Sequence, residues 1–222
     1  MNQTPAHDLI NPELMAMIPP QTRRIVDVGC MQGSLAKVYR ANRPDTEVIG
    51  IDIDANYAAV AAEHCTEAIA ADIEQMPDEK FEKLSPSDCW VFGDCLEHLR
   101  DPWRMLERVR ATIDAQGCTL VCLPNAQHWS VQWRLASGNF RYEDSGLMDR
   151  THIRWFTRTT MLELFSSTGW RIEQGLTRMI RSDDEDRHLQ AVKAYAEACG
   201  LNPDVAAQDA QPFQYMFKLV PH

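Results

Sequence analysis

The sequence predicts an α/β fold, a doubly wound and mostly parallel β-sheet with helices on both faces. Short apolar runs of strand-like composition alternate with helix-like runs over residues 22–125, and this alternation implies a parallel sheet. The first strand leads into a glycine turn and a helix in "IVDVGCMQGSLA". Successive strands also end in a polar residue or glycine, at the edge where such sheets bind ligands.

The elements of the first half follow from local patterns. A short amphipathic helix is predicted at residues 8–18, ended by Pro19-Pro20. Strands are predicted at "RRIVDVG", "TEVIGIDI", "AIAAD", "SDCWVFGD" and "CTLVCLP", and the first helices at "GSLAKVYRAN" and "ANYAAVAAEHC". A further helix runs from Asp101, its cap, to about Gln116, before Gly117. Its apolar residues at helical spacing are expected to face the sheet: Trp103, Leu106, Val109 and Ile113.

The second half has a different character. Residues 126–150 contain the aromatic-rich "HWSVQWRLASGNF", expected to be partly helical, and then the loop-like "RYEDSGLMD". A helix is predicted from about Arg158 to Thr168, with Thr157 as its cap and Gly169 as its stop. Two late strands are predicted at "WRIEQGLTRM" and "PFQYMFKLV", with a helix between them that ends at Gly200.

Composition limits the classes of partner and compartment. The 22 Lys and Arg residues against 32 Asp and Glu give a net charge of −10, which argues against a nucleic-acid partner. The seven cysteines form no CxxC pair, and most lie in apolar runs. Reduced, mostly buried thiols and a cytosolic setting are therefore expected. No signal peptide is visible, and no apolar stretch approaches the roughly 18 residues of a membrane span.

The glycine turn narrows the choice of ligand. Gly29 and Gly33 are four residues apart with no glycine between them, so the G-x-G-x-x-G fingerprint of dinucleotide-binding proteins is not matched. The following "GSL" lacks the lysine of a Walker loop. Met31 stands where a middle glycine is common. Because a left-handed conformation costs a non-glycine residue roughly 1–2 kcal/mol, we expect a negative φ at Met31 and a side chain that covers the ligand or packs beside it.

The next two strand ends add polar contacts to this turn. Asp52 ends the second strand, where its carboxylate can accept hydrogen bonds from both hydroxyls of a ribose. Asp72 ends the third strand, and together with Ile73 it is placed to meet an adenine edge. Polar residues also end the fourth and fifth strands, at Asp94 and Asn125. A site for a ribose and an adenine without a phosphate indicates S-adenosylmethionine.

The segments "VDVGCMQGSL", "VIGIDID", "AADIE", "GDCLEHLRDP" and "LVCLPN" resemble, in this order and spacing, the class I S-adenosylmethionine-dependent methyltransferases. The resemblance covers about residues 22–175. It implies a seven-stranded Rossmann-like sheet that ends in an antiparallel hairpin. It also implies one domain over 1–222, with a cofactor-binding core at about 22–125, an acceptor-side lid at about 126–155 and a C-terminal helix and hairpin at about 156–222. The cofactor-binding residues expected are Asp27, Gly29, Met31, Gly33, Asp52, Ile53, Asp72, Ile73 and Asp94.

A second group of polar residues points to the acceptor. "DCLEHL" places Asp94, Glu97 and His98 on one face of a helical turn at the fourth strand end, and "DRTHIRWFTR" adds His152. Two histidines with carboxylates can hold Mg²⁺ or Mn²⁺. This arrangement is similar to the E-x-x-E-H element and later histidine of ubiquinone-pathway O-methyltransferases and of small-RNA 2′-O-methyltransferases. In the second group these residues bind a divalent ion that engages a vicinal diol. The alternative is that Glu97 caps a helix and His98 lines the pocket without metal.

The fifth strand end supplies another candidate. His128 follows "LPNAQ" and is a candidate general base, with a structural role equally open. The catalytic candidates are therefore His98, His128 and His152. Trp129 and Trp133 stand at helical spacing, which is more typical of core residues than of a pocket wall.

The segments "NPELMAMIPP", "VFGDCLEHLRDPW", "LPNAQHWSVQWRL" and "GLMDRTHIRWFTRTTM" resemble bacterial methyltransferases associated with surface-polysaccharide and glycan biosynthesis. That resemblance implies methylation of a hydroxyl on a sugar, glycan or related small diol. Two alternatives stay open: a methyltransferase acting on RNA or protein, which the charge of −10 disfavours, and a non-catalytic cofactor-binding scaffold. The sequence leaves the acceptor and the oligomeric state open.

Overall fold

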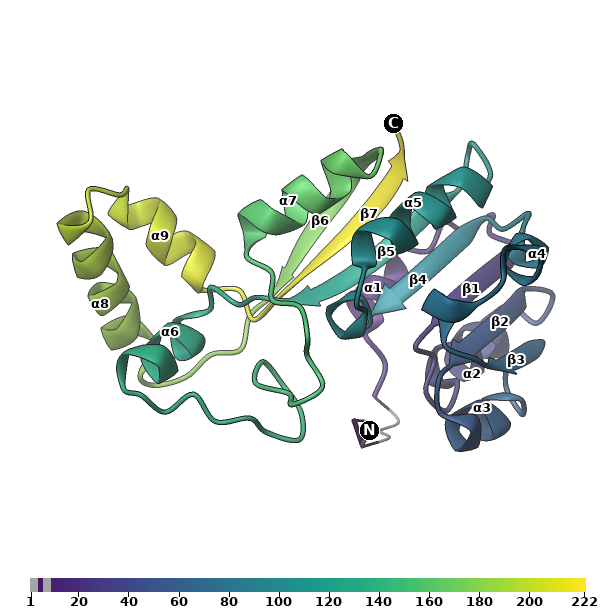
Figure 1. Ribbon diagram of the computed structural model, residues 1–222, viewed down its shortest axis with the longest axis horizontal. Coiled ribbons are helices and arrows are strands. Elements are labelled where there is room, and N and C mark those ends of the chain that lie inside the picture. Colours follow the sequence, from purple (N-terminus) through teal and green to yellow (C-terminus); the bar gives the residue numbers. More distant parts are fainter. Residues whose placement is uncertain (1–3, 6–8) are drawn as a thin grey trace.

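A seven-stranded mixed sheet forms the centre of the computed structural model, which describes residues 4–5 and 9–222 (Figure 1). Its strand order is β3-β2-β1-β4-β5-β7-β6. Strands β1 to β5 pair in parallel, and β7 runs antiparallel to both β5 and β6. The predicted sheet and its antiparallel hairpin are therefore confirmed. The strands are β1 (Arg24–Val28), β2 (Glu47–Asp52), β3 (Glu67–Ala70), β4 (Cys89–Gly93), β5 (Cys118–Pro124), β6 (Trp170–Arg178) and β7 (Gln214–Pro221).

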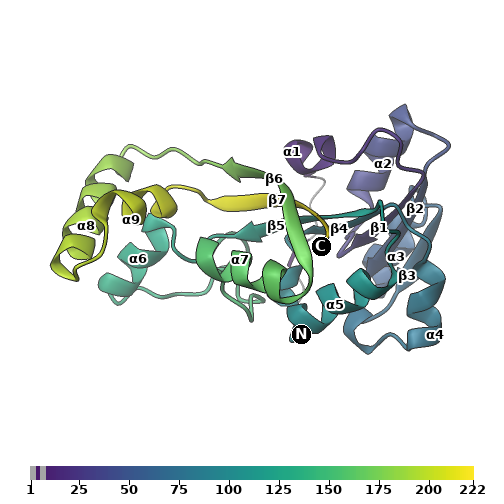
Figure 2. The same ribbon diagram turned by 90° about the horizontal axis from the view of Figure 1, so that it is seen from above.

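Helices cover both faces of this sheet (Figure 2). Alternate residues of β1 point to opposite faces, so Val26 and Ile25 belong to two separate hydrophobic clusters. The described helices around the sheet are α1 (Pro12–Ala16), α2 (Ser34–Asn42), α3 (Ala55–Ala61), α4 (Asp78–Phe81), α5 (Pro102–Thr112) and α7 (Arg158–Ser167), with the 3₁₀ turns η1 (Ile73–Gln75), η2 (Glu82–Leu84) and η3 (Leu96–His98). Residues of α5 and α7 lie in one cluster and residues of α1, α2 and α3 in the other.

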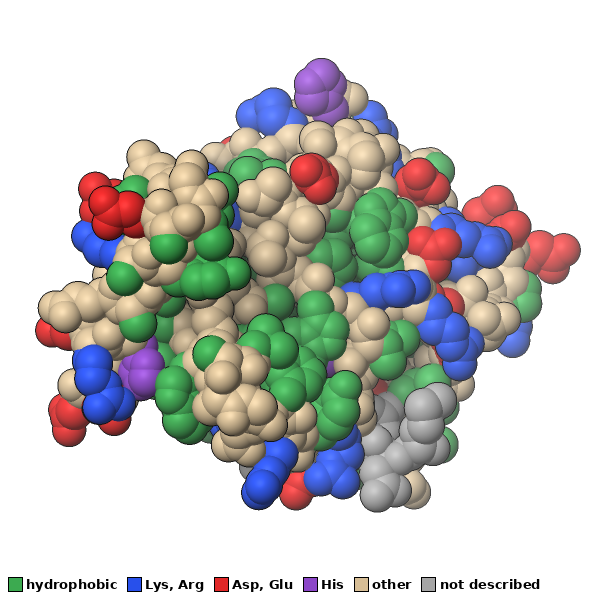
Figure 3. Space-filling view, turned by 60° about the vertical axis from the view of Figure 1, so that its left-hand side comes forward, with side chains coloured by type: hydrophobic (Ala, Val, Ile, Leu, Met, Phe, Trp, Pro, Cys, Tyr) green, Lys and Arg blue, Asp and Glu red, His purple; other side chains and the backbone are tan. Residues whose placement is uncertain are grey.

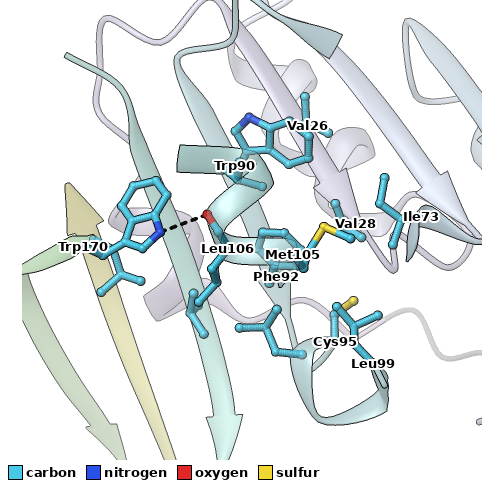
Figure 4. Packing of buried hydrophobic residues seen from close by; sticks show 14 of the residues in the cluster. Val26, Val28, Ile73, Trp90, Phe92, Cys95, Leu99, Met105, Leu106 and Trp170 are labelled. Atoms are coloured by element: carbon cyan, nitrogen blue, oxygen red, sulfur yellow. Dashed lines mark hydrogen bonds between the residues drawn. The ribbon is translucent and has the colours of Figure 1, made fainter. Parts of the chain in front are cut away.

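The larger cluster is built from aromatic and aliphatic side chains of the central strands and of α5 (Figure 4). Trp90 and Phe92 of β4 are fully buried, with ring centroids 6.3 Å apart. Trp170 begins β6, and its indole Nε1 donates a hydrogen bond of 3.2 Å to the carbonyl of Leu106 in α5. A buried indole N–H needs such a partner, so this bond fixes α5 against the hairpin.

The capping predictions are confirmed, with corrections to the extent of two helices. Thr157 caps α7 in a capping box, and Asp101 caps α5 by accepting from the backbone N–H of Arg104. Helix α5 ends at Thr112, earlier than predicted, because Ile113 is already extended. The first helix begins only at Pro12; residue 8 of its predicted range lies outside the described part of the chain.

The expected orientation of Trp103 is wrong. Its side chain is 40% exposed, while the other three apolar residues of the α5 stripe are buried. Its ring lies 6.2 Å from the ring of Phe156, in the segment that precedes α7. The guanidinium carbon of Arg154 lies over the same indole, 5.9 Å from the ring centroid. Trp103 therefore packs on residues 154–156, which precede α7, and not on the sheet.

Three further helices form a separate group beyond the carboxyl end of β5 (Figure 1). They are α6 (Trp129–Ala136), α8 (Glu185–Ala198) and α9 (Pro203–Ala210). Helix α8 confirms the predicted helix before Gly200, whereas α9 was not predicted. Its cap is Asn202, whose side chain accepts from two backbone N–H groups, and Pro203 occupies the first turn. We refer to α6, α8 and α9 as the helical lobe. Within residues 4–5 and 9–222, no helix is long and apolar enough to cross a membrane.

Candidate cofactor and acceptor site

The turn after β1 lies where the strand order reverses, because β2 and β4 flank β1 on opposite sides. Parallel sheets bind ligands in the crevice at such a point. Gly29 and Gly33 both adopt left-handed conformations, with φ of 74° and 79°. A Cβ atom on Gly33 would lie 3.1 Å from the Cα atom of Ala61 in α3. Gly33 therefore allows the start of α2 to pack closely on α3.

The prediction of a negative φ at Met31 is wrong, because φ is +47°. In this conformation the backbone N–H of Met31 donates a 2.8 Å hydrogen bond to Oδ2 of Asp52. A hydrogen bond to a charged or partly charged carboxyl group contributes about 1.5–3 kcal/mol, enough to offset the left-handed strain of about 1–2 kcal/mol. The strained turn is thus held by the end of β2.

Two carboxyl groups lie beneath this turn. Asp27 in β1 and Asp52 at the end of β2 are both 5% exposed. Burial raises the pKa of Asp52. It also raises the pKa of Asp27 to about 7, and the negative charge of Asp52 adds to this increase. A ligand that carries positive charge would relieve this electrostatic cost, and S-adenosylmethionine carries a sulfonium and an ammonium group.

The remaining predicted cofactor residues take different positions. Asp72 is half-buried, and its Oδ1 accepts from the backbone N–H of Glu74, so that it caps η1. Its Oδ2 lies 4.0 Å from the guanidinium of Arg100. Ile73 is buried in the core, whereas Ile53 beside Asp52 is 60% exposed. Of this hydrophobic pair, only Ile53 therefore presents its side chain at the surface.

On the acceptor side, Glu97 and His98 of η3 meet His152. The imidazole Nε2 of His152 lies 3.8 Å from Oε1 of Glu97, and the two imidazole rings lie 4.9 Å apart. One ligand atom from each of the three residues lies within 4.8 Å of the others. The backbone N–H groups of Ile153 and Arg154 both donate to the carbonyl of Glu97 at 3.0 Å. These bonds bring the distant segment to η3, and we call the three side chains the Glu97 cluster.

Burial disfavours the charged form of each side chain in the Glu97 cluster. Glu97 is fully buried, and neither of its carboxyl oxygens has a hydrogen-bond partner among the described residues. Burial, with the charge of Asp94 as a smaller cause, raises the pKa of Glu97 well above its ordinary value. Burial lowers the pKa of His98, and burial with the nearby His98 lowers the pKa of His152 to about 4.

A short hydrogen-bonded chain orients His98. Its Nδ1 lies 3.2 Å from the carbonyl oxygen of Thr151, to which it can donate. The hydroxyl of Thr151 donates to Oδ1 of Asp149 at 2.6 Å, and the backbone N–H of Thr151 donates to the same oxygen. Sequence reasoning did not assign Thr151 a role. The only signal was its place inside "DRTH", between two residues that were already candidates.

Asp94 and His128 lie outside the Glu97 cluster. The expectation that Asp94 shares a helical face with Glu97 and His98 is wrong, because Asp94 has φ of +55° and precedes the turn. Its carboxylate accepts from the side-chain amide of Gln214 in β7. His128 caps α6 and lies 2.8 Å from the hydroxyl of Ser130 through Nδ1. Burial lowers the pKa of His128 to about 4.

Comparison with known proteins identifies the family. Residues 5–174 match a family model described as a methyltransferase domain. A search of curated proteins finds no match.

Solved structures share the fold. A S-adenosylmethionine-dependent methyltransferase from Archaeoglobus fulgidus has 17% identity and a TM-score of 0.60, covering 94% of this chain and 91% of its own. The plantazolicin methyltransferase BpumL, in complex with SAH, has 15% identity and a TM-score of 0.61, covering 95% and 80%. An O-methyltransferase from a polyketide synthase multienzyme of Brevibacillus brevis, with S-adenosyl-L-homocysteine, has 12% identity and a TM-score of 0.60, covering 95% and 71%.

The names of these neighbours point to different substrates, so they do not single out glycan-associated or ubiquinone-pathway enzymes. At these low identities the structural likeness shows the fold, and the family model shows the family. The chain therefore belongs to the methyltransferase-domain family and has the fold of the class I S-adenosylmethionine-dependent methyltransferases.

Proposed function

We propose that this protein transfers a methyl group from S-adenosylmethionine to a hydroxyl of a sugar, glycan or related small diol. The observation that carries the proposal is the Glu97 cluster. A fully buried carboxyl group, whose two oxygens have no hydrogen-bond partner among the described residues, stands beside two imidazoles at the end of β4. Such buried polar groups are costly unless a ligand or ion satisfies them. Their place beside the turn after β1 is where an acceptor would meet a bound cofactor.

The proposed cofactor contacts begin at the turn after β1. In this proposal the turn from Gly29 to Gly33, with Asp27 beneath it, approaches the methionine part of the cofactor. Asp52 and the adjoining Ile53 hold the ribose, and Asp72 with Ile73 meets the adenine. Each carboxyl oxygen of Asp52 accepts one backbone N–H, from Met31 or Asp54. Because a carboxylate oxygen has two lone pairs, both oxygens retain capacity for a ribose hydroxyl.

The Glu97 cluster fits a divalent ion. The N–H at Nδ1 of His98 is directed to the carbonyl of Thr151, which leaves the lone pair of Nε2 for a metal. His152 is neutral, and Glu97 supplies an oxygen once it releases its proton. One carboxylate and two imidazoles suit Mn²⁺ better than Mg²⁺, because Mg²⁺ prefers oxygen ligands alone. An ion held here would lower the pKa of an acceptor hydroxyl.

A metal-free histidine base is the less favoured form of this mechanism. General bases act best when their pKa lies near the working pH. The pKa of His152 is about 4, and that of His98 is also lowered, so neither imidazole takes a hydroxyl proton readily. The residues of this chain would then contribute chiefly orientation of the acceptor and exclusion of water. In the same proposal, residues 126–155 form the acceptor side of the cleft.

A methyl-transfer screen tests the proposal. The purified chain is given S-adenosylmethionine with nucleotide sugars, catechols and RNA ends, with Mn²⁺, with Mg²⁺ and with a chelator. We expect transfer to a sugar or diol hydroxyl that the chelator abolishes and Mn²⁺ restores. Glu97→Gln should lower turnover by about 100-fold or more, since it removes a charged metal ligand. Its affinity for the cofactor should change by less than about threefold.

The exposed Glu107 of α5 provides a matched control. Glu107→Gln makes the same chemical change outside the site, so its turnover and cofactor affinity should equal those of the unaltered chain. Chelator-insensitive transfer together with a fully active Glu97→Gln protein would remove the metal from the proposal. Failure to bind S-adenosylmethionine, or transfer to RNA ends alone, would overturn the proposed function itself.

A further inference from the structure

A cavity of about 240 Å³ lies between α6 and the start of α8, in the helical lobe. Its lining residues come from Trp129, Trp133 and Arg134 of α6 and from Asp184, Arg187 and His188 at the other wall. None of these residues belongs to the Glu97 cluster or to the turn after β1. Figure 3 turns this side of the molecule forward and shows hydrophobic side chains gathered on it beside charged ones.

Part of the cavity wall is formed by aromatic rings. The ring of Trp129 stacks on that of His188, with centroids 4.7 Å apart and planes inclined by 9°. Trp133 meets the same imidazole edge-on at 6.0 Å and keeps 45% of its surface exposed. Trp129 also packs against the small apolar cluster that joins α8 to α9. Aromatic rings held in this way present a preformed surface that needs little ordering on binding.

One buried donor in the cavity wall is unsatisfied. The indole Nε1 of Trp129 is buried and has no hydrogen-bond partner among the described residues. Buried Trp N–H groups usually find a partner. Because this donor is also shielded from solvent, an acceptor on a ligand satisfies it only if the indole shifts toward the cavity.

The rim of the cavity supplies donors and acceptors together. The guanidinium of Arg134 lies 2.6 Å from the carboxylate of Glu143, and that of Arg187 lies 3.4 Å from the carboxylate of Asp184. An anionic ligand would approach these carboxylates unfavourably, and a purely apolar one would desolvate the charged groups without compensation. A ligand with apolar faces and several hydroxyls satisfies both kinds of wall, since each hydroxyl both donates and accepts.

We propose that this cavity is a binding subsite for one pyranose ring of the acceptor, distinct from the ring that is methylated. The inference rests on the proposed function and gives it a substrate class, an oligosaccharide or glycoside. Pockets for drug-sized ligands have volumes of about 300–1,000 Å³, so a cavity of about 240 Å³ suits a single ring. The C–H face of the sugar lies on Trp133, and its hydroxyls reach Arg187 and Asp184.

The position of α6 links this subsite to the acceptor cleft. Val131, on the same helix, packs with Met148 in the segment that leads to His152. Helix α6 therefore stands between the cavity and the segment that carries one residue of the Glu97 cluster. An acceptor of more than one ring can extend from the cavity around α6 toward the cluster.

Ligand-observed NMR on the full chain tests the subsite. The probes are methyl glycosides of gluco-, galacto-, manno- and N-acetylglucosamine configuration, with benzoate and cyclohexanol as an anionic and an apolar comparison. We expect at least one glycoside to bind with a dissociation constant of about 1–10 mM. Trp133→Ala should weaken that binding by about tenfold or more, because it removes the stacking face. Trp133→Phe, which keeps a flat ring, should stay within about threefold.

Leu135→Ala is the matched control, since Leu135 is on the same helix, is 60% exposed and does not line the cavity. It should bind the glycoside as the unaltered chain does. No glycoside binding at about 50 mM probe, glycoside binding that Trp133→Ala leaves unchanged, or binding of benzoate or cyclohexanol in place of every glycoside would each overturn the subsite.

The subsite and the proposed function fail separately. Binding of S-adenosylhomocysteine, measured by calorimetry on the same variants, reports the cofactor side alone. Methyl transfer to a sugar hydroxyl that Trp133→Ala does not alter would overturn the subsite and keep the function. Glycoside binding that depends on Trp133, in a chain that transfers no methyl group to any sugar, would overturn the function and keep a sugar site.

Discussion

Met31 shows how a single residue can depart from its expected conformation. A left-handed conformation at a methionine is unfavourable by itself, yet here it directs a backbone N–H at the carboxyl group of Asp52. The strain and the hydrogen bond act on the same peptide unit. Because residue 31 contributes only its backbone N–H to this bond, any residue that tolerates a positive φ at this position can form it.

Substitutions at Met31 test this account. Met31→Gly removes left-handed strain of about 1–2 kcal/mol and adds chain entropy in the unfolded state worth roughly 0.5–1 kcal/mol. We therefore expect its free energy of unfolding to stay within about 1 kcal/mol of the unaltered chain. Met31→Ile introduces a β-branched residue at positive φ and should lower that free energy by about 1–2 kcal/mol. Urea denaturation of the three proteins measures both changes.

The same variants report on the side chain of Met31. Met31→Gly should change the affinity for S-adenosylhomocysteine by less than about tenfold, roughly 1.4 kcal/mol. Calorimetry measures this value. Complete loss of binding in a folded Met31→Gly protein would show that the methionine side chain, and not only its backbone, contacts the cofactor.

Asp27 predicts a pH-dependent contribution to stability. Its pKa in the folded chain is about 7, against an ordinary value of about 4. A carboxyl group whose folded pKa is raised contributes stability that is present below its unfolded pKa and lost as the pH rises through the folded pKa. For Asp27 this loss extends from about pH 4 to about pH 7.

Asp27→Asn removes this ionisation, and with it the loss of stability as the pH rises. We expect the free energy of unfolding of Asp27→Asn, relative to the unaltered chain, to increase by about 2–3 kcal/mol between about pH 5 and pH 8. Denaturant titrations of both proteins at each pH measure this difference. Asp45→Asn is the control, because Asp45 is exposed and its charge is hydrated in both states. A difference that does not grow with pH would contradict the raised pKa.

At the scale of elements, local signals predicted most of the fold. Thr157 and Asp101 occupy the capping positions that the sequence assigned to them, because a cap depends on contacts within about three residues. The α/β alternation likewise predicted the parallel strands, of which β1, β2, β4 and β5 bury apolar residues on both faces. Helix α9 carried comparable signals in Asn202 and Pro203. Its alanine-rich sequence lacks an apolar stripe, and the prediction therefore missed it.

The candidate site was less accessible to local reasoning. His152 lies beside Glu97, as the family resemblance implied. The backbone N–H groups of Ile153 and Arg154 hold it there by donating to the carbonyl of Glu97, which is more than fifty residues away. Asp94 instead contacts Gln214, 120 residues away, and no spacing in the sequence indicates that contact. Met31 differs from the prediction because its hydrogen-bond partner lies on the next strand. Local rules fail at these positions because the deciding contacts are long-range.

The whole molecule has two parts joined at the carboxyl end of β5. The sheet and its flanking helices contain the two large hydrophobic clusters, whereas the helical lobe has a small cluster of its own. Asn125 lies at the junction and is fully buried. Its side-chain amide donates to the carbonyls of Asp209 and Pro212 at 2.8 Å, and its carbonyl oxygen accepts from the backbone N–H of Gln127.

These bonds give Asn125 a structural role, although its place at a strand end made it part of the predicted ligand-binding edge. The side-chain groups hold the start of α6 and the connection from α9 to β7 against the end of β5. Its backbone N–H also donates to the carbonyl of Phe213. One residue thus ties two of the connections between the sheet and the helical lobe, β5–α6 and α9–β7, to the end of β5.

We therefore expect Asn125→Ala to loosen the helical lobe and to leave the sheet intact. The substitution leaves buried carbonyls and a backbone N–H without partners, which should lower the free energy of opening the helical lobe by about 2–4 kcal/mol. Local opening should concentrate where the lost bonds were. Hydrogen exchange followed by mass spectrometry should show faster exchange in α6, α8 and α9 and unchanged protection in β1 and β2. Asn56→Ala, at an exposed position of α3, should alter neither. Equal loss of protection in sheet and lobe would show that Asn125 supports the whole fold and not the junction alone.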